Sequence, residues 1–250
     1  MCLIVFAWQA HPHYRLIVAA NRDELHQRAA LAAGWWPEEP TVLAGRDLQA
    51  DGTWLAIARS GRFATVTNYH EHRHIDGAPK SRGALVTAFV TAEEGPQTYV
   101  EALDESQYAG FSLLAAEGDE LAYVSNRGDP PRLLPPGIYG LSNAALDTPW
   151  PKLVRSRERL RELLQADAVA EEDLLHLLAD RTPAEVSVSD DLPFTLAQNI
   201  SSPFIVSSEY GTRCSTALLF THDGQITFNE RRFDSDGAIS GESHFSFVVS

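Results

Sequence analysis

The chain has 250 residues, of which 44% are hydrophobic, so it can bury a substantial core, and nothing in its composition is typical of a disordered protein. Thirty-four acidic against 20 basic side chains give a formal charge of −14, which opposes nonspecific attraction to nucleic acid or anionic lipid. We therefore expect one domain over residues 1–250, with neither nucleic acid nor a lipid surface as its partner.

The cysteine content and the N-terminus narrow the class of protein further. Two cysteines, Cys2 and Cys214, are too few for a disulfide framework, and no Cys/His spacing resembles a structural zinc site. The opening apolar run is too short for a membrane-spanning helix, and no basic segment precedes it as in a signal peptide. These features predict a cytoplasmic protein with no integral membrane segment, no metal site and no cofactor.

The first two apolar runs, Cys2 to Trp8 and Tyr14 to Ala20, have the length of strands, and the short segment between them contains a proline. This pattern predicts a β-hairpin. Folding the hairpin about His11 places Cys2 opposite Ala20 and brings Asn21 to Glu24 out just beyond that pair. A thiol, an arginine and two carboxylates then share one strand end.

Cys2 becomes a candidate nucleophile if Met1 is removed. Its free α-amine, with an ordinary pKa of about 7.7–8.0, can then act as the base for its own thiol, and a neighbouring Arg22 favours the thiolate form. The alternative is that Cys2 is a small apolar residue that starts a buried strand, while Arg22, Asp23 and Glu24 form a solvated turn. The hairpin and the charges alone favour this second interpretation.

A second hairpin is predicted after an irregular stretch. Residues 25 to 52 contain two prolines that argue against a long helix, and we expect this stretch to be irregular. Thr53 to Ala58 and Arg62 to Thr67 then read as two strands with Asn68 at their open end. The amide of Asn68 can donate to an oxyanion, but an isolated Asn is more often a turn former.

Three histidines follow, His70, His72 and His74, which alternation would place on one face of a strand. Such a cluster suggests a metal site or a haem ligand. No distant partner is evident, so a solvated loop is the favoured interpretation.

Helices and hairpins alternate through the rest of the chain. Apolar spacing predicts helices over Gly83 to Ala92, Pro96 to Leu103, Pro151 to Gln165 and Glu171 to Ala179. The third of these helices carries five basic residues that we assign to its solvated face, namely Lys152, Arg155, Arg157, Arg159 and Arg161.

Three strand regions complete the predicted elements. A hairpin joins Gly110 to Ala116 with Glu120 to Ser125, and a short strand at Gly137 to Leu141 leads into Asn143, which has the same ambiguity as Asn68. The last hairpin joins Arg213 to Phe220 with Gln225 to Arg231. From the residues alone Arg213 is an exposed strand-edge cation, and Cys214 points to the opposite face as a core residue.

Seven motifs occur in order along nearly the whole chain. They are Met1-Cys2, Asn21-Arg22-Asp23-Glu24, Asp51-Gly52-Thr53-Trp54-Leu55, Gly61-Arg62-Phe63-Ala64 running to Thr67-Asn68-Tyr69, Ser81-Arg82-Gly83, Leu141-Ser142-Asn143 and Tyr210-Gly211-Thr212-Arg213. Together they resemble the NRDE family, also called the transport and Golgi organisation protein 2 family. That family is similar to the N-terminal nucleophile hydrolases of the choloylglycine hydrolase and penicillin V acylase kind.

The resemblance implies an α+β fold, a four-layer αββα sandwich, with Cys2 as a nucleophile freed by loss of Met1. It matches Asn68 to the oxyanion Asn, Asn143 to a second active-site Asn, and Arg213 to an arginine near the nucleophile. In choloylglycine-type enzymes the carboxylate that orients the amine stands three residues after the Arg. Here Asp23 and Glu24 follow Arg22 by one and two residues, and we assign the role to Asp23.

The function implied by the resemblance is a cysteine amidase or acyl hydrolase acting on a small-molecule acyl substrate, a linear amide or a thioester. Its catalytic residues would be Cys2, Arg22, Asp23, Asn68, Asn143 and Arg213. The family is also linked to membrane organisation, acyl-lipid metabolism and haem handling, so the alternative is a non-catalytic protein that binds and transfers haem or acyl-coenzyme A. Retention of Met1 would block the amine mechanism but would leave binding possible.

Overall fold

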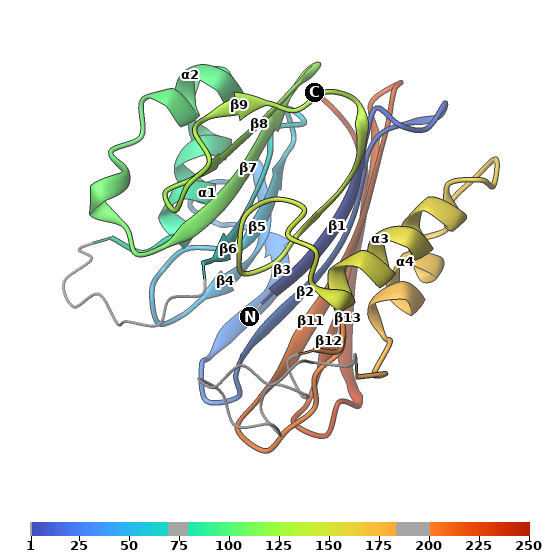
Figure 1. Cartoon of the computed structure of the whole chain (residues 1–250). Coiled ribbons are helices and arrows are strands. Elements are labelled where there is room, and N and C mark those ends of the chain that lie inside the picture. The colour runs from blue at the N-terminus through green and yellow to red at the C-terminus, as the bar shows by residue number, and fades with distance from the viewer. Residues whose placement is uncertain (1, 70–79, 184–200) are drawn as a thin grey trace.

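The structure is a computed structural model, and it describes residues 2–69, 80–183 and 201–250. Two antiparallel sheets pack face to face, and two helices lie on the outer face of each sheet (Figure 1). Met1 and the three histidines His70, His72 and His74 lie outside the described residues.

Six strands form the first sheet in the order β10-β1-β2-β11-β12-β13, and seven form the second in sequence order from β3 to β9. The strands of the first sheet are β1 Cys2–Trp8, β2 Tyr14–Leu25, β10 Gly137–Leu141, β11 Tyr210–Thr221, β12 Gln225–Phe233 and β13 Ile239–Val248. Those of the second are β3 Ala30–Trp35, β4 Val42–Asp47, β5 Leu55–Ala58, β6 Phe63–Asn68, β7 Phe111–Glu117, β8 Glu120–Ser125 and β9 Arg132–Leu133. The helices are α1 Gly83–Thr91, α2 Pro96–Glu101, α3 Pro151–Leu163 and α4 Glu171–Leu178, with a short 3-10 turn at Glu105–Gln107.

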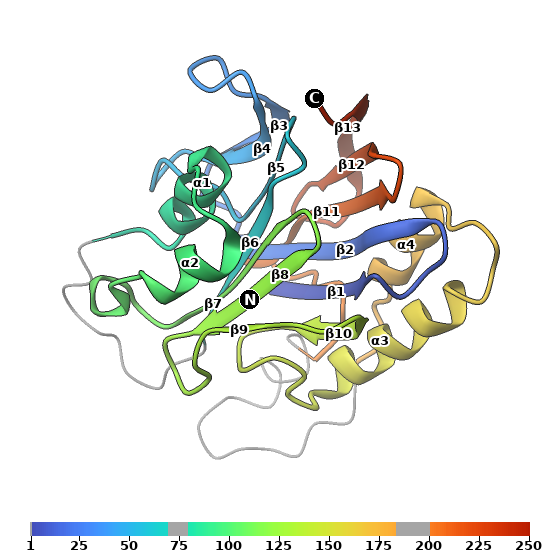
Figure 2. The same cartoon turned by 90° about the horizontal axis from the view of Figure 1, so that it is seen from above.

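Alternation along β1 assigns its side chains to two different cores. Ile4 and Phe6 face the second sheet and join the core between the sheets, whereas Leu3 and Val5 face α3 and α4. Because both faces of the strand are covered, β1 reads as a continuous apolar run rather than an alternating one. Figure 2 shows the four layers from above, and they confirm the predicted αββα sandwich.

The first hairpin has a different register from the predicted one. Cys2 pairs with Arg22, and Ala20 pairs with Ile4, because the turn is centred on Pro12 rather than on His11. β2 also continues to Leu25, so Asn21 to Glu24 are strand residues and not a segment beyond the hairpin. Arg22 is therefore the direct cross-strand neighbour of Cys2.

Two further expectations about strands were wrong. The stretch expected to be irregular contains β3 and β4, and its two prolines, Pro37 and Pro40, lie in the turn between them, where they interrupt no ladder. β13 was not predicted at all. Its side chains alternate between exposed and half-buried, so the strand lacks the run of buried apolar residues that would have marked it in the sequence.

Candidate active site

A cleft of about 350 Å³ opens where Cys2 begins β1. Cys2, Arg22 and Asp23 reach it from the first sheet, whereas Trp54 and Asn68 reach it from the second. Residues before and at the start of α1 also line the cleft, namely Lys80, Ser81, Arg82 and Gly83. The cleft therefore brings together groups from both sheets.

The main chain of Cys2 is held by the two residues that follow β10. The nitrogen of Cys2 donates to Oδ1 of Asn143 at 3.0 Å, and the carbonyl oxygen of Cys2 accepts from Oγ of Ser142 at 2.6 Å. Pairing of β10 with β1 delivers both groups to this position. Nδ2 of Asn143 donates in turn to the main-chain oxygen of Asn68 at 2.8 Å, so the Asn143 amide links the two sheets.

Asn68 is the last residue of β6 and pairs with Phe111 of β7, so it is a strand residue and not a turn former. It is half-buried and lines the cleft. Within the part of the chain that the structure describes, its side-chain amide makes no hydrogen bond. That amide is consequently available to a ligand in the cleft.

Of the two carboxylates in the motif, Asp23 is the buried one. It is 1% exposed, and its Oδ1 accepts a hydrogen bond of 2.7 Å from Oγ1 of Thr212. Burial raises the pKa of Asp23, and the positive charge of Lys152 is the largest opposing influence. Glu24 is half-buried, and its carboxylate accepts from the main-chain nitrogen of Leu25.

Arg22 lies between an acidic and an aromatic side chain. Its Nη2 is 3.2 Å from Oδ2 of Asp47, and its guanidinium lies 4.4 Å from the ring centre of Trp54. Arg28 donates to the same Asp47 oxygen at 2.6 Å. Burial acts to raise the pKa of Asp47, but the hydrogen bond and charge of Arg28 outweigh it and hold that pKa below its ordinary value.

Lys152 was assigned to the solvated face of its helix, and that assignment is wrong. It is 1% exposed, and its Nζ has no hydrogen-bond partner within residues 2–69, 80–183 and 201–250. The first turn of α3 packs on β1 and β10, so the second residue of the helix points into the protein. Burial lowers the pKa of Lys152, and the negative charges of Asp23 and of the Cys2 thiolate act in the opposite sense.

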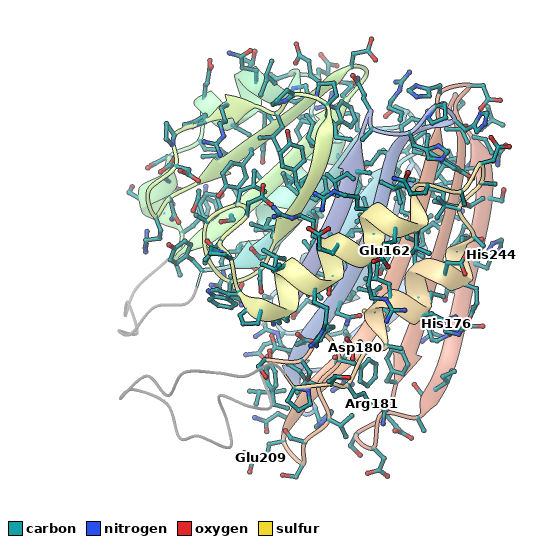
Figure 3. The ribbon with its side chains drawn as sticks, turned by 45° about the vertical axis from the view of Figure 1, so that its right-hand side comes forward. Glu162, His176, Asp180, Arg181, Glu209 and His244 are labelled. Carbon is teal, nitrogen blue, oxygen red and sulfur yellow. The ribbon has the colours of Figure 1, made fainter. Side chains whose placement is uncertain are left out.

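The arginines of the same helix behave as predicted. Arg155, Arg157 and Arg161 form ion pairs with partly exposed carboxylates on the outer side of the molecule. Figure 3 shows this outer side, where Glu162 of α3 and His176 of α4 lie on the exposed faces of the two helices. The sequence contained one indication that Lys152 differs from its neighbours on the helix. Of the 20 basic residues in the chain, two are lysines, Lys80 and Lys152.

Arg213 does not line the cleft, unlike Cys2, Arg22, Asp23 and Asn68, and Asn143 adjoins the cleft through its hydrogen bond with the Cys2 nitrogen. It lies at a shift in register between Thr212 and Cys214, and its Nη1 donates to the main-chain oxygens of Leu25 and His26 at 3.3 and 2.6 Å. It lines a separate cavity of about 100 Å³. Cys214 is 4% exposed, and burial raises the pKa of its thiol well above the ordinary value, in keeping with the predicted core position.

Two findings about the described residues concern metal sites and membrane-spanning helices. None of their His, Cys, Asp and Glu side chains gather in a group of three or more that could hold a metal ion. None of their helices has the length and apolar character needed to cross a membrane.

Comparison with known proteins extends these observations. The family model for Transport and Golgi organisation 2 matches residues 1–235. The Transport and Golgi organization protein 2 homolog of Homo sapiens is 36% identical over 256 residues and covers 92% of each chain. Transport and Golgi organization protein 2 of Drosophila melanogaster is 29% identical over 270 residues, which is 92% of this chain and 91% of that protein.

A solved structure shares the fold. The Caenorhabditis elegans ortholog of N-acylethanolamine-hydrolyzing acid amidase superposes with a TM-score of 0.52 at 9% identity, covering 87% of this chain and 92% of that one. This likeness shows that the two proteins share a fold, here the αββα sandwich. The sequence match over nearly the whole length does not depend on that structural likeness. It shows that the chain belongs to the Transport and Golgi organisation 2 family.

Proposed function

We propose that the chain is an N-terminal cysteine hydrolase that acts on a linear amide or thioester once Met1 has been removed. The observation that carries the proposal is the hydrogen bond from the Cys2 nitrogen to Asn143 beside the cleft that Cys2 lines. Loss of Met1 turns this nitrogen into a free amine that already has an acceptor and that belongs to the same residue as the thiol.

The chemistry balances with groups that this chain supplies. The Cys2 thiol gives its proton to the α-amine, its sulfur bonds to the carbonyl carbon of the substrate, and the carbonyl electron pair moves to oxygen. Collapse of the tetrahedral intermediate breaks the bond to the leaving nitrogen or sulfur, which takes the proton from the ammonium. Water then attacks the thioester on Cys2 by the same route, releasing the acid and restoring the thiol.

The geometry favours different roles for the two asparagines. The Asn68 amide is available at the cleft and is assigned to the oxyanion, where a donor acts mainly on the transition state. Asn143 is assigned to the amine, because its Oδ1 accepts from the Cys2 nitrogen and its Nδ2 is engaged by the Asn68 carbonyl. The resemblance matched Asn143 only to a second active-site Asn, and this assignment gives that residue a role at the amine.

Charged residues around Cys2 have supporting roles. Arg22 is the cross-strand neighbour of Cys2 and places a positive charge beside it, and Asp23 is assigned to stabilise the protonated amine. Arg213 contacts the main chain of Leu25 and His26, so its part in the proposal is to fix the end of β2 rather than to meet the substrate.

Mass spectrometry tests the proposal directly. Intact mass first establishes whether Met1 is removed, and the processed protein is then incubated with an activated ester, a short acyl-coenzyme A and an N-acyl amide. We expect an acyl adduct on Cys2 in the wild type and in Cys214→Ala, and none in Cys2→Ala. Absence of an adduct with every donor, together with haem or acyl-coenzyme A binding that survives Cys2→Ala, would overturn the hydrolase and favour a binding or transfer protein.

A further inference from the structure

We propose that Lys152 is a positioning residue of the Cys2 site, and that its buried ammonium is the counter-charge that keeps Asp23 ionised. The inference rests on the proposed function, in which an ionised Asp23 stabilises the protonated amine of Cys2. It adds to the site a residue on α3, a helix that contributes nothing to the described lining of the cleft.

The packing of α3 explains why Lys152 is buried. The helix begins at Pro151 and contacts β1, which Cys2 starts, and β10, which leads into Asn143. The approach is close, because a Cβ atom added at Gly140 of β10 would lie 2.7 Å from the side chain of Leu153. Glycine at this position therefore lets the first turn of α3 settle onto the strands and carries Lys152 inward.

Alternation along β2 turns Asp23 toward the same layer. Arg22 faces Trp54 and Asp47 between the sheets, so its neighbour Asp23 faces the helices, as Ile17 and Ala19 do. Asp23 and Lys152 are then both buried on the helix side of the sheet. Each exerts the largest charge effect on the ionisation of the other, and the Cys2 thiolate is the second negative charge that acts on Lys152.

Energetics distinguishes this arrangement from an ordinary lysine packed along a surface. Surface lysines bury the aliphatic stem and keep the ammonium in water. The Nζ atom of Lys152 is instead buried, and it donates a hydrogen bond to none of the described residues. A buried ammonium is costly unless an opposite charge compensates it. The ring centre of Trp150 lies 5.9 Å from Nζ, and the carboxylate of Asp23 is the negative charge that acts most strongly on Lys152.

The choice of residue type supports a specific role. Eighteen of the 20 basic residues are arginines, and the two lysines are Lys152 and Lys80, which lines the cleft. A lysine presents a compact point charge, whereas the planar guanidinium of arginine needs several acceptors. An enclosed position beside one carboxylate therefore suits lysine and not arginine.

The two lysines make the pairing measurable without any turnover. In protein labelled at the lysine side chains, NMR gives two lysine signals, and Lys80→Arg assigns them. We expect Asp23→Asn to lower the proton affinity of Lys152 about tenfold or more, and to leave that of Lys80 unchanged. An unchanged proton affinity of Lys152 in Asp23→Asn would overturn the pairing.

Variants of Lys152 test the effect on the site. Removal of the cation in Lys152→Met makes Asp23 easier to protonate, so the acid limb of the rate of Cys2 acylation should move to higher pH. Lys152→Arg keeps the positive charge and should therefore show a smaller shift than Lys152→Met, and Arg161→Met, a partly exposed position on the same helix, should cause none. An unshifted acid limb in Lys152→Met would contradict the positioning role.

A double variant covers the case in which the single variants fold poorly. Asp23→Asn alone leaves a buried ammonium without its counter-charge, so adding Lys152→Met should raise the melting temperature again; additive losses would contradict the pairing. Failure of this inference can be distinguished from failure of the proposed function. If Cys2 is never acylated but Lys152 responds to Asp23→Asn, the hydrolase fails and the charge coupling stands. If Cys2 is acylated but Lys152 does not respond, the hydrolase stands and the coupling fails.

Discussion

The nitrogen of Cys2 lies 3.0 Å from Oδ1 of Asn143, although 141 positions separate the two residues in sequence. The other end of the same amide donates to the Asn68 carbonyl. One buried side chain thus fixes the start of β1 relative to the end of β6, which belongs to the opposite sheet.

Asn143→Ala should slow acylation of Cys2 by about 10²-fold, because the amine loses its acceptor and the reacting groups lose their alignment. Asn143→Asp keeps an acceptor for the amine, but it sets a carboxylate against the Asn68 carbonyl, so it should recover only part of the rate. Single-turnover acylation followed by mass spectrometry measures both effects. Equal rates in Asn143→Ala and wild type would contradict the assigned role.

Asn68→Ala should lower kcat by roughly 10²–10³-fold while KM and the melting temperature change little, since a donor to the oxyanion acts in the transition state. Asn126→Ala is the matched control. Asn126 accepts from the main-chain nitrogen of Phe111, the strand partner of Asn68, so its loss should lower the melting temperature without that loss of kcat. The opposite pattern would make Asn68 a structural residue.

Iodoacetamide should label Cys2 much faster than Cys214 at neutral pH. Cys214 is buried, and the raised pKa of its thiol keeps it protonated, whereas Cys2 is partly exposed at the cleft. Arg22→Ala should slow the labelling of Cys2, because a cation beside the thiol favours the thiolate. Peptide mapping of each cysteine over time gives the rates, and equal rates in the folded protein would remove the case for an activated Cys2.

Asp47→Asn should lower the free energy of unfolding at pH 7 by about 2 kcal/mol, because it removes a charged partner from the buried Arg22. The folded-state pKa of Asp47 is depressed, so its contribution is present above the ordinary value of 3.8 and is lost as pH falls through the folded pKa. The variant should therefore show a shallower decline in stability below about pH 4 than the wild type.

Urea unfolding across this pH range provides the measurement for Asp47. Asp51→Asn, in the same region of the chain but with a far more exposed carboxylate, should change stability little. Parallel curves for Asp47→Asn and wild type below pH 4 would show that Asp47 is not ionised and paired in the folded state.

Strands and helices with apolar patterning could be predicted from the sequence, whereas register could not. The apolar run of β1 identifies a buried strand, but the partner of Cys2 depends on where the turn is centred, and a turn with several polar residues fixes no centre. The predicted pairing with Ala20 was two residues from the observed one. For the same reason the sequence did not show that Arg22 and Asp23 face different layers.

The motif Asn21 to Glu24 contains both a structural residue and candidate catalytic residues, and the local sequence does not distinguish them. Nδ2 of Asn21 donates to the carbonyl oxygens of Leu178 and Pro203, and its Oδ1 accepts from Ser215, so it joins α4 and a later segment to the first sheet. Asn21 is therefore a structural residue, next to the candidate catalytic residues Arg22 and Asp23. Its partners lie far away in sequence, and so does Asp23, the counter-charge that we propose for Lys152, so local sequence made that lysine resemble its solvated neighbours.

The division of the cleft between two sheets has a mechanical consequence. The sulfur of Cys2 belongs to one sheet and the amide of Asn68 to the other, and side chains such as Phe6 and Leu114 fill the space between them. In the proposed hydrolase, the distance between Cys2 and Asn68 therefore depends on the packing of an apolar layer. Compression by hydrostatic pressure, or the loss of one methyl group deep inside that layer, should then alter the rate of Cys2 acylation without a change in any polar residue.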